Sequence, residues 1–239
     1  MTPSGTAPAD TLVGLVLVSH SSQIADGLVA LARQMAPTVP LVPAGGTDEG
    51  GIGTSFTKVT DGINAADTGV GVVILCDLGS AILTAETALD FLDDDVRARV
   101  RVADAPLVEG AVAAAVSAET GGDLDVVLHA AESALRDSAR PAADSSAEAS
   151  SAAVGPVERT VTLRNRDGLH ARPAADFVKL ASTFDAEVTV NGKDARSLLG
   201  IMSLGLTRGA SVQISGRDEG ARAAVDALAD LIESGFGEE

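Results

Sequence analysis

The sequence has 239 residues, of which 46% are hydrophobic, and its formal net charge at pH 7 is -17. This acidity and an aromatic content of 2% exclude a protein that neutralises a nucleic-acid backbone or stacks on bases. One cysteine and three scattered histidines favour neither a disulfide framework nor a metal site, and no apolar run is long enough to cross a bilayer. We therefore expect a cytoplasmic protein without a membrane segment, metal or cofactor.

The chain divides at a segment of low complexity. Residues 137–156 are rich in Ala, Ser, Asp and Pro and contain one large apolar residue, Val154. This composition predicts a flexible linker between two domains, residues 11–136 and 157–239. Most of the acidity belongs to the first half, because residues 1–136 contain 6 Lys and Arg against 18 Asp and Glu.

The first half alternates continuous apolar runs with segments of helical period. The runs predict strands that are buried on both faces, as in a parallel sheet covered by helices. After the first run, Ile24, Leu28, Leu31 and Met35 recur at helical spacing, which predicts one apolar helix face. We expect an α/β domain with a doubly wound parallel sheet. Its predicted strands are residues 12–18, 39–42, 70–76 and 100–102; helical segments start at Phe56 and at Val108, the latter being interrupted by Gly121 and Gly122.

His20 directly follows the first predicted strand and precedes a helix. In open α/β sheets, ligands and reacting groups lie at this edge of the sheet. A phosphoryl group on His20 would lie near the free N–H groups of a helix start. The alternative is a turn residue without a chemical role. The same edge is expected to receive two small-residue loops, 45–55 and 76–80; the first lacks the Gly-Lys-Ser/Thr ending of a nucleotide-binding loop.

Asp77 and Ser80 lie just after the third predicted strand, and we predict that both stabilise a phosphoryl group on His20. The Asp77 carboxylate would accept the proton of one imidazole nitrogen and leave the other as the nucleophile. The alternative for Asp77 is a helix cap. The neighbouring Cys76 is predicted to be a small core residue, and His129 a structural or surface residue.

The second half has a different pattern of apolar residues, in which short segments of alternating apolar and polar residues are separated by helical segments. This pattern predicts a small α+β domain, an open-faced sandwich with helices on one face of an antiparallel sheet. The predicted strands are residues 159–163, 186–190 and 210–214, and the predicted helices are 172–182, 198–204 and 219–233.

His170 is the strongest candidate for chemistry in the second half. It follows a glycine-containing turn, and Ala171, Arg172 and Pro173 then open a helix, where proline is tolerated in the first turn. The imidazole, the helix N-terminus and Arg172 together form a predicted phosphate site, although an ordinary helix start is the alternative. Ser197 is predicted to cap the next short helix, and a regulatory role is its second interpretation.

Residues 157–239 resemble HPr, the histidine carrier of the bacterial phosphotransferase system, through the segments GLHARPA and SLLGIMSLGLTRGA. The resemblance implies that His170 carries the phosphoryl group and that Arg172 contacts it. It also implies that Ser197 is similar to a serine that a kinase modifies in some bacteria. The loop between His170 and Ser197 is shorter than the common form of this family.

Residues 11–136 resemble the mannose-class EIIA domain of the same system, in the DhaM variant that serves phosphoenolpyruvate-dependent dihydroxyacetone kinases. The resemblance rests on VGLVLVSHSSQIADGLVALARQM, GTSFTKVTDGI, VVILCDLGSA and APLVEGAVAAAVSAE. In that family the histidine after the first strand, here His20, receives phosphate from HPr. It passes the phosphate to ADP held by the DhaL subunit, whose ATP then phosphorylates dihydroxyacetone bound to DhaK.

The resemblance therefore implies a phosphotransferase with phosphohistidine intermediates at His170 and His20, and a homodimer through the first domain. Some family members carry an Enzyme I-like segment after HPr, which this sequence does not contain, so a separate Enzyme I is expected as donor. Two other functions fit the residues: a sugar-transport EIIA–HPr fusion, and a regulatory module whose phosphorylation state a partner senses. The CDLGSA and PLVEGA segments favour the kinase donor.

Overall fold

The computed structural model describes residues 11–138, 157–166, 168–217 and 219–237. The chain forms two compact units, residues 1–135 and 136–239. The predicted linker, residues 137–156, lies almost wholly outside the described residues. Within the described ranges, no helix combines the length and the apolar character needed to cross a bilayer.

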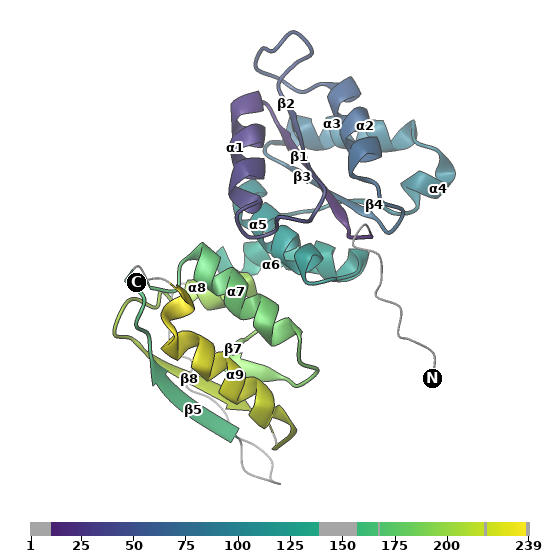
Figure 1. Ribbon diagram of the computed structural model, residues 1–239. Helices are drawn as coiled ribbons and strands as arrows, with labels where there is room; N and C mark the ends of the chain where they lie inside the picture. The colour runs from purple at the N-terminus through teal and green to yellow at the C-terminus, as the bar shows by residue number, and fades with distance from the viewer. Residues whose placement is uncertain (1–10, 139–156, 167, 218, 238–239) are drawn as a thin grey trace. The chain divides into compact units, whose positions relative to one another are not determined.

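The first unit is built around a four-stranded parallel sheet in the order β2-β1-β3-β4 (Figure 1). Its strands are β1 (Gly14–Ser19), β2 (Leu41–Gly45), β3 (Val72–Cys76) and β4 (Val100–Val102). Every residue of β1 and β3 is buried, because helices cover both faces of these central strands. The predicted α/β fold with a parallel sheet is confirmed.

The two faces of this sheet are covered by different helices. On one face, Val16 of β1 and Ile74 of β3 belong to a hydrophobic core. Val59 and Ile63 of α2 and Ala85 of α3 complete this core. Helices α1 and α5 pack against each other and against β1. The helices are α1 (Ser22–Ala32), α2 (Phe56–Ala66), α3 (Gly79–Asp90), α4 (Asp94–Arg97), α5 (Leu107–Glu119) and α6 (Leu124–Ser138).

The buried face of α1 differs from the predicted one. Ile24 and Leu31 are 51% and 44% exposed, whereas Leu28 is buried. The buried stripe runs through Ala25, Leu28, Val29 and Ala32, which also recur at spacings of three and four. The alanines at both ends of this stripe allow the helix to approach the sheet closely, so small residues rather than the largest ones select the face.

The second unit is an antiparallel sheet in the order β5-β8-β6-β7. In β5 and β8, buried residues alternate with more exposed ones, as expected for a sheet with one covered face. The predicted α+β sandwich is confirmed, with one further short strand, β7. The elements are β5 (Val157–Thr162), α7 (Ala171–Ser182), β6 (Val188–Val190), β7 (Lys193–Asp194), α8 (Leu198–Ser203), β8 (Ser211–Gly216) and α9 (Arg222–Glu233), with short 3-10 turns at Glu219–Ala221 and Gly235–Gly237.

Candidate active site

The first candidate site lies at the carboxyl edge of the parallel sheet. His20 follows β1, and Asp77 follows β3, the neighbouring strand. The register pairs Val18 with Cys76, and the Asp77 N–H donates to the Val18 carbonyl at 3.2 Å. This pairing brings together two side chains that are 57 positions apart in the sequence.

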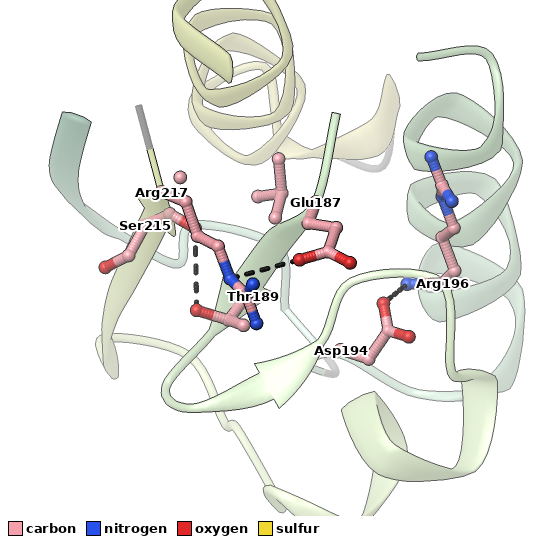
Figure 2. A pocket seen from close by; sticks show the side chains of 8 residues that line it. Glu187, Thr189, Asp194, Arg196, Ser215 and Arg217 are labelled. Atoms are coloured by element: carbon pink, nitrogen blue, oxygen red, sulfur yellow. Dashed lines mark hydrogen bonds and ion pairs between the residues drawn. The ribbon is translucent and has the colours of Figure 1, made fainter. Parts of the chain in front are cut away.

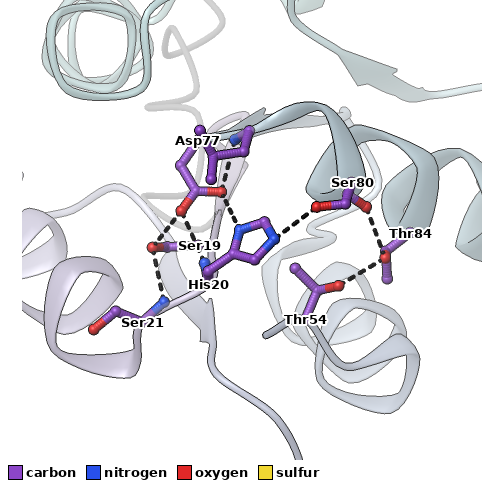
Figure 3. Close-up of polar contacts among 8 residues, drawn as sticks. Ser19, His20, Ser21, Thr54, Asp77, Ser80 and Thr84 are labelled. Atoms are coloured by element: carbon purple, nitrogen blue, oxygen red, sulfur yellow. Dashed lines mark hydrogen bonds and ion pairs between the residues drawn. The ribbon is translucent and has the colours of Figure 1, made fainter. Parts of the chain in front are cut away.

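The Asp77 carboxylate accepts hydrogen bonds from four groups (Figure 3). One oxygen, Oδ2, accepts from the Ser19 hydroxyl and from the His20 N–H, both at 2.8 Å. The other, Oδ1, lies 2.9 Å from His20 Nδ1 and accepts from the Leu78 N–H at 2.8 Å. The carboxylate is thus held in one orientation against the imidazole.

These contacts keep Asp77 ionised. Burial by itself raises the pKa of this carboxyl, but the hydrogen bonds from the His20 N–H, the His20 ring, the Ser19 hydroxyl and the Leu78 N–H together lower it. An ionised carboxylate only accepts hydrogen bonds, so Nδ1 of His20 must carry the proton. Nε2 then holds the free lone pair.

The Nε2 side of the ring faces the hydroxyl group of Ser80. The Ser80 hydroxyl lies 2.7 Å from Nε2 and, because Nε2 has no proton in this tautomer, Ser80 donates. Ser80 is exposed in the first turn of α3. The loop 45–55 also reaches His20, because the Gly53 N–H donates to the His20 carbonyl at 2.9 Å.

The structure therefore brings together three of the predicted site residues, His20, Asp77 and Ser80. Asp77 faces His20 rather than capping α3, whose N-cap position is Leu78 and has no side-chain cap bond. Cys76 is buried as predicted, and burial, followed by the charges of Asp77 and Glu86, raises the pKa of its thiol to about 12.

Sequence reasoning overlooked the part that Ser19 takes in this site. Ser19 was not predicted to belong to the site, but its side chain is fully buried and its hydroxyl donates to Asp77. The Ser19 oxygen also accepts from the Ser21 N–H at 3.1 Å. The one signal available in the sequence was a serine at the end of a continuous apolar run, directly before a histidine.

The second candidate site is the start of α7. His170 occupies the N-cap position of this helix, and both His170 and Arg172 are exposed. Pro173 is buried in the first turn, where its missing N–H leaves no helical bond unmade. An exposed imidazole therefore stands at the positive end of a helix with a cation two residues away.

The turn before His170 depends on Gly168. Its φ is +72°, and a Cβ at this position would lie 2.4 Å from the Leu206 carbonyl oxygen. Its neighbour Leu169 donates to that same oxygen at 2.8 Å. The backbone of the turn therefore lies in direct contact with residues 206–207. This contact positions the segment that leads into α7.

Substitution of Gly168 by Ala is expected to destabilise the second unit by about 3 kcal/mol, the sum of left-handed strain and a steric clash. Gly209→Ala is the matched control, because Gly209 has a φ of +86° but no atom within 4 Å of the added Cβ. It is expected to cost about 1 kcal/mol. Native-state hydrogen exchange of the α7 and α9 amides measures both values. Equal losses would contradict the clash with Leu206.

Two further residues considered in the sequence analysis, Ser197 and His129, lie on other elements of the chain than His20 and His170. Ser197 caps α8 as predicted, since its hydroxyl accepts from the Gly200 N–H at 3.1 Å. His129 is exposed on α6. A surface hollow of about 430 Å³ lies at the β6–β7 end of the second sheet, where Arg217 and Glu187 form an ion pair at 3.0 Å (Figure 2). Its lining contains no histidine among the described residues.

Two family models match separate parts of the chain. Residues 14–128 match the EIIA-man model, described as the PTS system fructose IIA component. Residues 157–234 match the PTS-HPr model, described as the PTS HPr component phosphorylation site.

Curated relatives match the same two parts. The chain is 36% identical over 241 residues to the phosphoryl donor subunit DhaM of the PEP-dependent dihydroxyacetone kinase of Escherichia coli K12, covering 95% of this chain and 51% of that protein. It is 40% identical over 118 residues to the DhaM of kinase 2 of Listeria innocua, covering 49% of this chain and 94% of the relative. The phosphocarrier protein HPr of Haloferax volcanii is 43% identical over 82 residues, 32% of this chain and 92% of that protein.

Four DhaM proteins, the one from Escherichia coli among them, match 95% of this chain, which spans about half of their length. The shorter matches cover nearly all of a DhaM protein with the first half, and nearly all of an HPr with the second. The chain therefore belongs to the DhaM family, with an EIIA-man domain followed by an HPr domain.

Proposed function

We propose that this chain is a phosphoryl carrier that receives phosphate from Enzyme I at His170, passes it to His20, and delivers it to ADP bound by a DhaL partner. The resulting ATP would phosphorylate dihydroxyacetone on DhaK. The observation that carries the proposal is the orientation of His20, whose Nδ1 faces the Asp77 carboxylate while Nε2 faces the Ser80 hydroxyl. The names of the DhaM relatives, phosphoryl donor subunits of a kinase, agree with it.

The transfer to His20 requires no proton movement on its ring. The bond between phosphorus and the His170 nitrogen breaks, and its electron pair stays on His170, while the Nε2 lone pair of His20 forms the new bond. The phosphorylated ring keeps the Nδ1 proton and becomes cationic, and the Asp77 carboxylate stabilises that charge at 2.9 Å. In the next step the Nε2–phosphorus bond breaks and a phosphate oxygen of ADP takes the phosphoryl group.

The arrangement of charged and N–H groups around His170 suits a carrier that must both accept and release phosphate. Arg172 and the first N–H groups of α7 are available to the phosphoryl oxygens. Both histidine and arginine are exposed, so the stabilisation is modest and the phosphoryl group remains transferable. Arg164 and Arg166, also exposed, add positive charge that attracts an acidic partner surface.

Two further elements belong to this proposal. The EIIA-man domain would form a homodimer, so that transfer from His170 to His20 takes place within one chain or across the dimer. Ser197 would be a regulatory position, because a phosphate on its hydroxyl would add negative charge at the start of α8, where the Gly200 N–H donates to that hydroxyl.

The test is a reconstituted reaction containing Enzyme I, phosphoenolpyruvate, this chain, DhaK, ADP-loaded DhaL and dihydroxyacetone. Dihydroxyacetone phosphate is expected only when all components are present, and omission of this chain or of Enzyme I is expected to abolish it. Phosphorylated chain without product would contradict the kinase-donor function, and would point to the sugar-transport or regulatory function instead.

A further inference from the structure

Two threonines, Thr54 and Thr84, lie near Ser80 on the Nε2 side of His20 (Figure 3). Thr84, one turn further along α3, has its hydroxyl 3.0 Å from the Ser80 carbonyl oxygen. Thr54, in the loop after β2, has its hydroxyl 2.9 Å from that of Thr84. Both threonines are half-buried, and neither was singled out from the sequence.

The directions of these hydrogen bonds follow from the number of protons. A carbonyl oxygen only accepts, so Thr84 donates its single hydroxyl proton to Ser80. The bond between the two threonines must therefore be donated by Thr54. The series runs from the loop, through Thr84, to the backbone of the residue whose hydroxyl contacts Nε2.

The loop is also fixed to His20 itself. Gly53 donates its N–H to the His20 carbonyl at 2.9 Å, and Thr54 is the next residue. The contacts form a closed circuit: His20 backbone, Gly53 and Thr54, Thr84, Ser80, and back to the His20 ring at 2.7 Å. Both threonine hydroxyls thus belong to the same series of contacts as the bond between Nε2 and the Ser80 hydroxyl.

We propose that Thr54 and Thr84 are positioning residues for phosphoryl transfer at His20, acting through Ser80; this inference rests on the proposed function. The circuit keeps the Ser80 hydroxyl beside Nε2 before transfer. When the Nε2–phosphorus bond forms and the bond to the donor nitrogen breaks, the same hydroxyl turns its proton from the Nε2 lone pair to a phosphoryl oxygen. No proton is lost or gained, and the hydroxyl needs to move little because its helix turn is already held in place.

The experiment uses the full chain with His170→Ala, so that phosphate reaches His20 directly from phosphoramidate, a small phosphoryl donor that needs no protein partner. The variants Ser80→Ala, Thr84→Val and Thr54→Val remove one hydroxyl each at nearly constant shape. Thr84→Ser restores the hydroxyl. Thr87→Val is the matched control, because Thr87 makes the same bond to the carbonyl four residues earlier in α3, at 2.7 Å, and is exposed.

We expect Ser80→Ala to slow phosphorylation of His20 about 30-fold, and each threonine-to-valine change to slow it about 5- to 10-fold. Thr84→Ser and Thr87→Val are expected to stay within about twofold of the starting chain. Because the threonines act through Ser80, the double variant Ser80→Ala/Thr84→Val is expected to lose no more than Ser80→Ala alone. Multiplying losses in the double variant would overturn the proposal.

A second measurement is independent of transfer. The ¹⁵N chemical shift of His20 Nε2 in the unphosphorylated chain reports the hydrogen bond from Ser80. It is expected to move in the same direction in Ser80→Ala, Thr84→Val and Thr54→Val, and to remain unchanged in Thr87→Val. An unchanged shift in both threonine variants would overturn the positioning role. The proposed function would be overturned instead if His20 stayed unphosphorylated both with phosphoramidate and, in the chain that keeps His170, with Enzyme I and phosphoenolpyruvate.

Discussion

Substitution of His20 by Ala is expected to leave phosphate on His170 and to lower the formation of dihydroxyacetone phosphate by more than about 10³-fold, because the second acceptor nitrogen is gone. The reciprocal variant, His170→Ala, is expected to carry no phosphate at either histidine when Enzyme I and phosphoenolpyruvate are the only donors. Peptide mass spectrometry at neutral to alkaline pH shows which histidine carries the phosphate. A coupled enzyme assay measures the formation of dihydroxyacetone phosphate.

His129→Ala is the matched control for both variants, since His129 is the one remaining histidine of the sequence and is exposed on α6. It is expected to retain full transfer. If His20 became phosphorylated by Enzyme I in the His170→Ala chain, the order of the two carriers would be wrong. Product formation by His20→Ala would show that phosphate leaves directly from His170.

Asp77→Asn is expected to slow phosphorylation of His20 by about 10²- to 10⁴-fold without removing the nucleophile. The oxygen of the new amide must take the place of Oδ2, because the Ser19 hydroxyl and the His20 N–H both donate there at 2.8 Å. The amide NH₂ then faces Nδ1, which must become an acceptor. The proton moves to Nε2, and the nitrogen that should attack phosphorus no longer has a lone pair.

The ¹⁵N spectrum of the imidazole measures this tautomer directly, alongside the rate of phosphorylation. Asp67→Asn is the matched control: Asp67 is another partly buried carboxylate of the first unit, and its pKa is lowered chiefly by its hydrogen bonds from Arg99. That change is expected to reduce stability but to leave the His20 tautomer and rate within about twofold. A rate for Asp77→Asn within about threefold of the unsubstituted chain would contradict the role given to Asp77.

The lowered pKa values of Asp77 and Asp67 predict how the stability of the first unit depends on pH. The pKa values of Asp77 and Asp67 are lower in the folded chain than in the unfolded chain, so the unfolded state binds more protons in acid. Their stabilising contributions are complete above the unfolded value of about 4 and are lost as the pH falls through the folded pKa. Urea unfolding at pH 7 and pH 3 is expected to show a smaller acid-induced loss in Asp77→Asn than in the unsubstituted chain.

Much of the architecture was predictable from the sequence. The strands β1 and β3 read as continuous apolar runs because helices bury both of their faces, and the second sheet reads as alternation because one of its faces is exposed. Local sequence also placed His20 at the end of a strand and His170 at the start of a helix. These predictions needed only the period of the apolar residues and the chemistry of helix ends.

The face of α1 was not predictable in the same way. Its sequence contains two overlapping stripes, and the larger side chains of Ile24 and Leu31 favoured the one that turned out to be exposed. Which stripe is buried depends on how closely the helix can approach the sheet, and Ala25 and Ala32 permit that approach. Helical periodicity contains no information about this distance.

The details of the candidate site were decided by tertiary structure. The sequence by itself predicted that a histidine, an aspartate and a serine follow strands of one parallel sheet, and so lie at the same edge; that the two strands are neighbours was decided by the sheet order. The sequence did not determine which imidazole nitrogen faces the carboxylate, that Ser19 supports Asp77, or that Thr54 and Thr84 connect the loop to Ser80. Those contacts join residues 30 to 60 positions apart, and they exist only because the strand register and the loop bonds set side-chain directions that no local pattern contains.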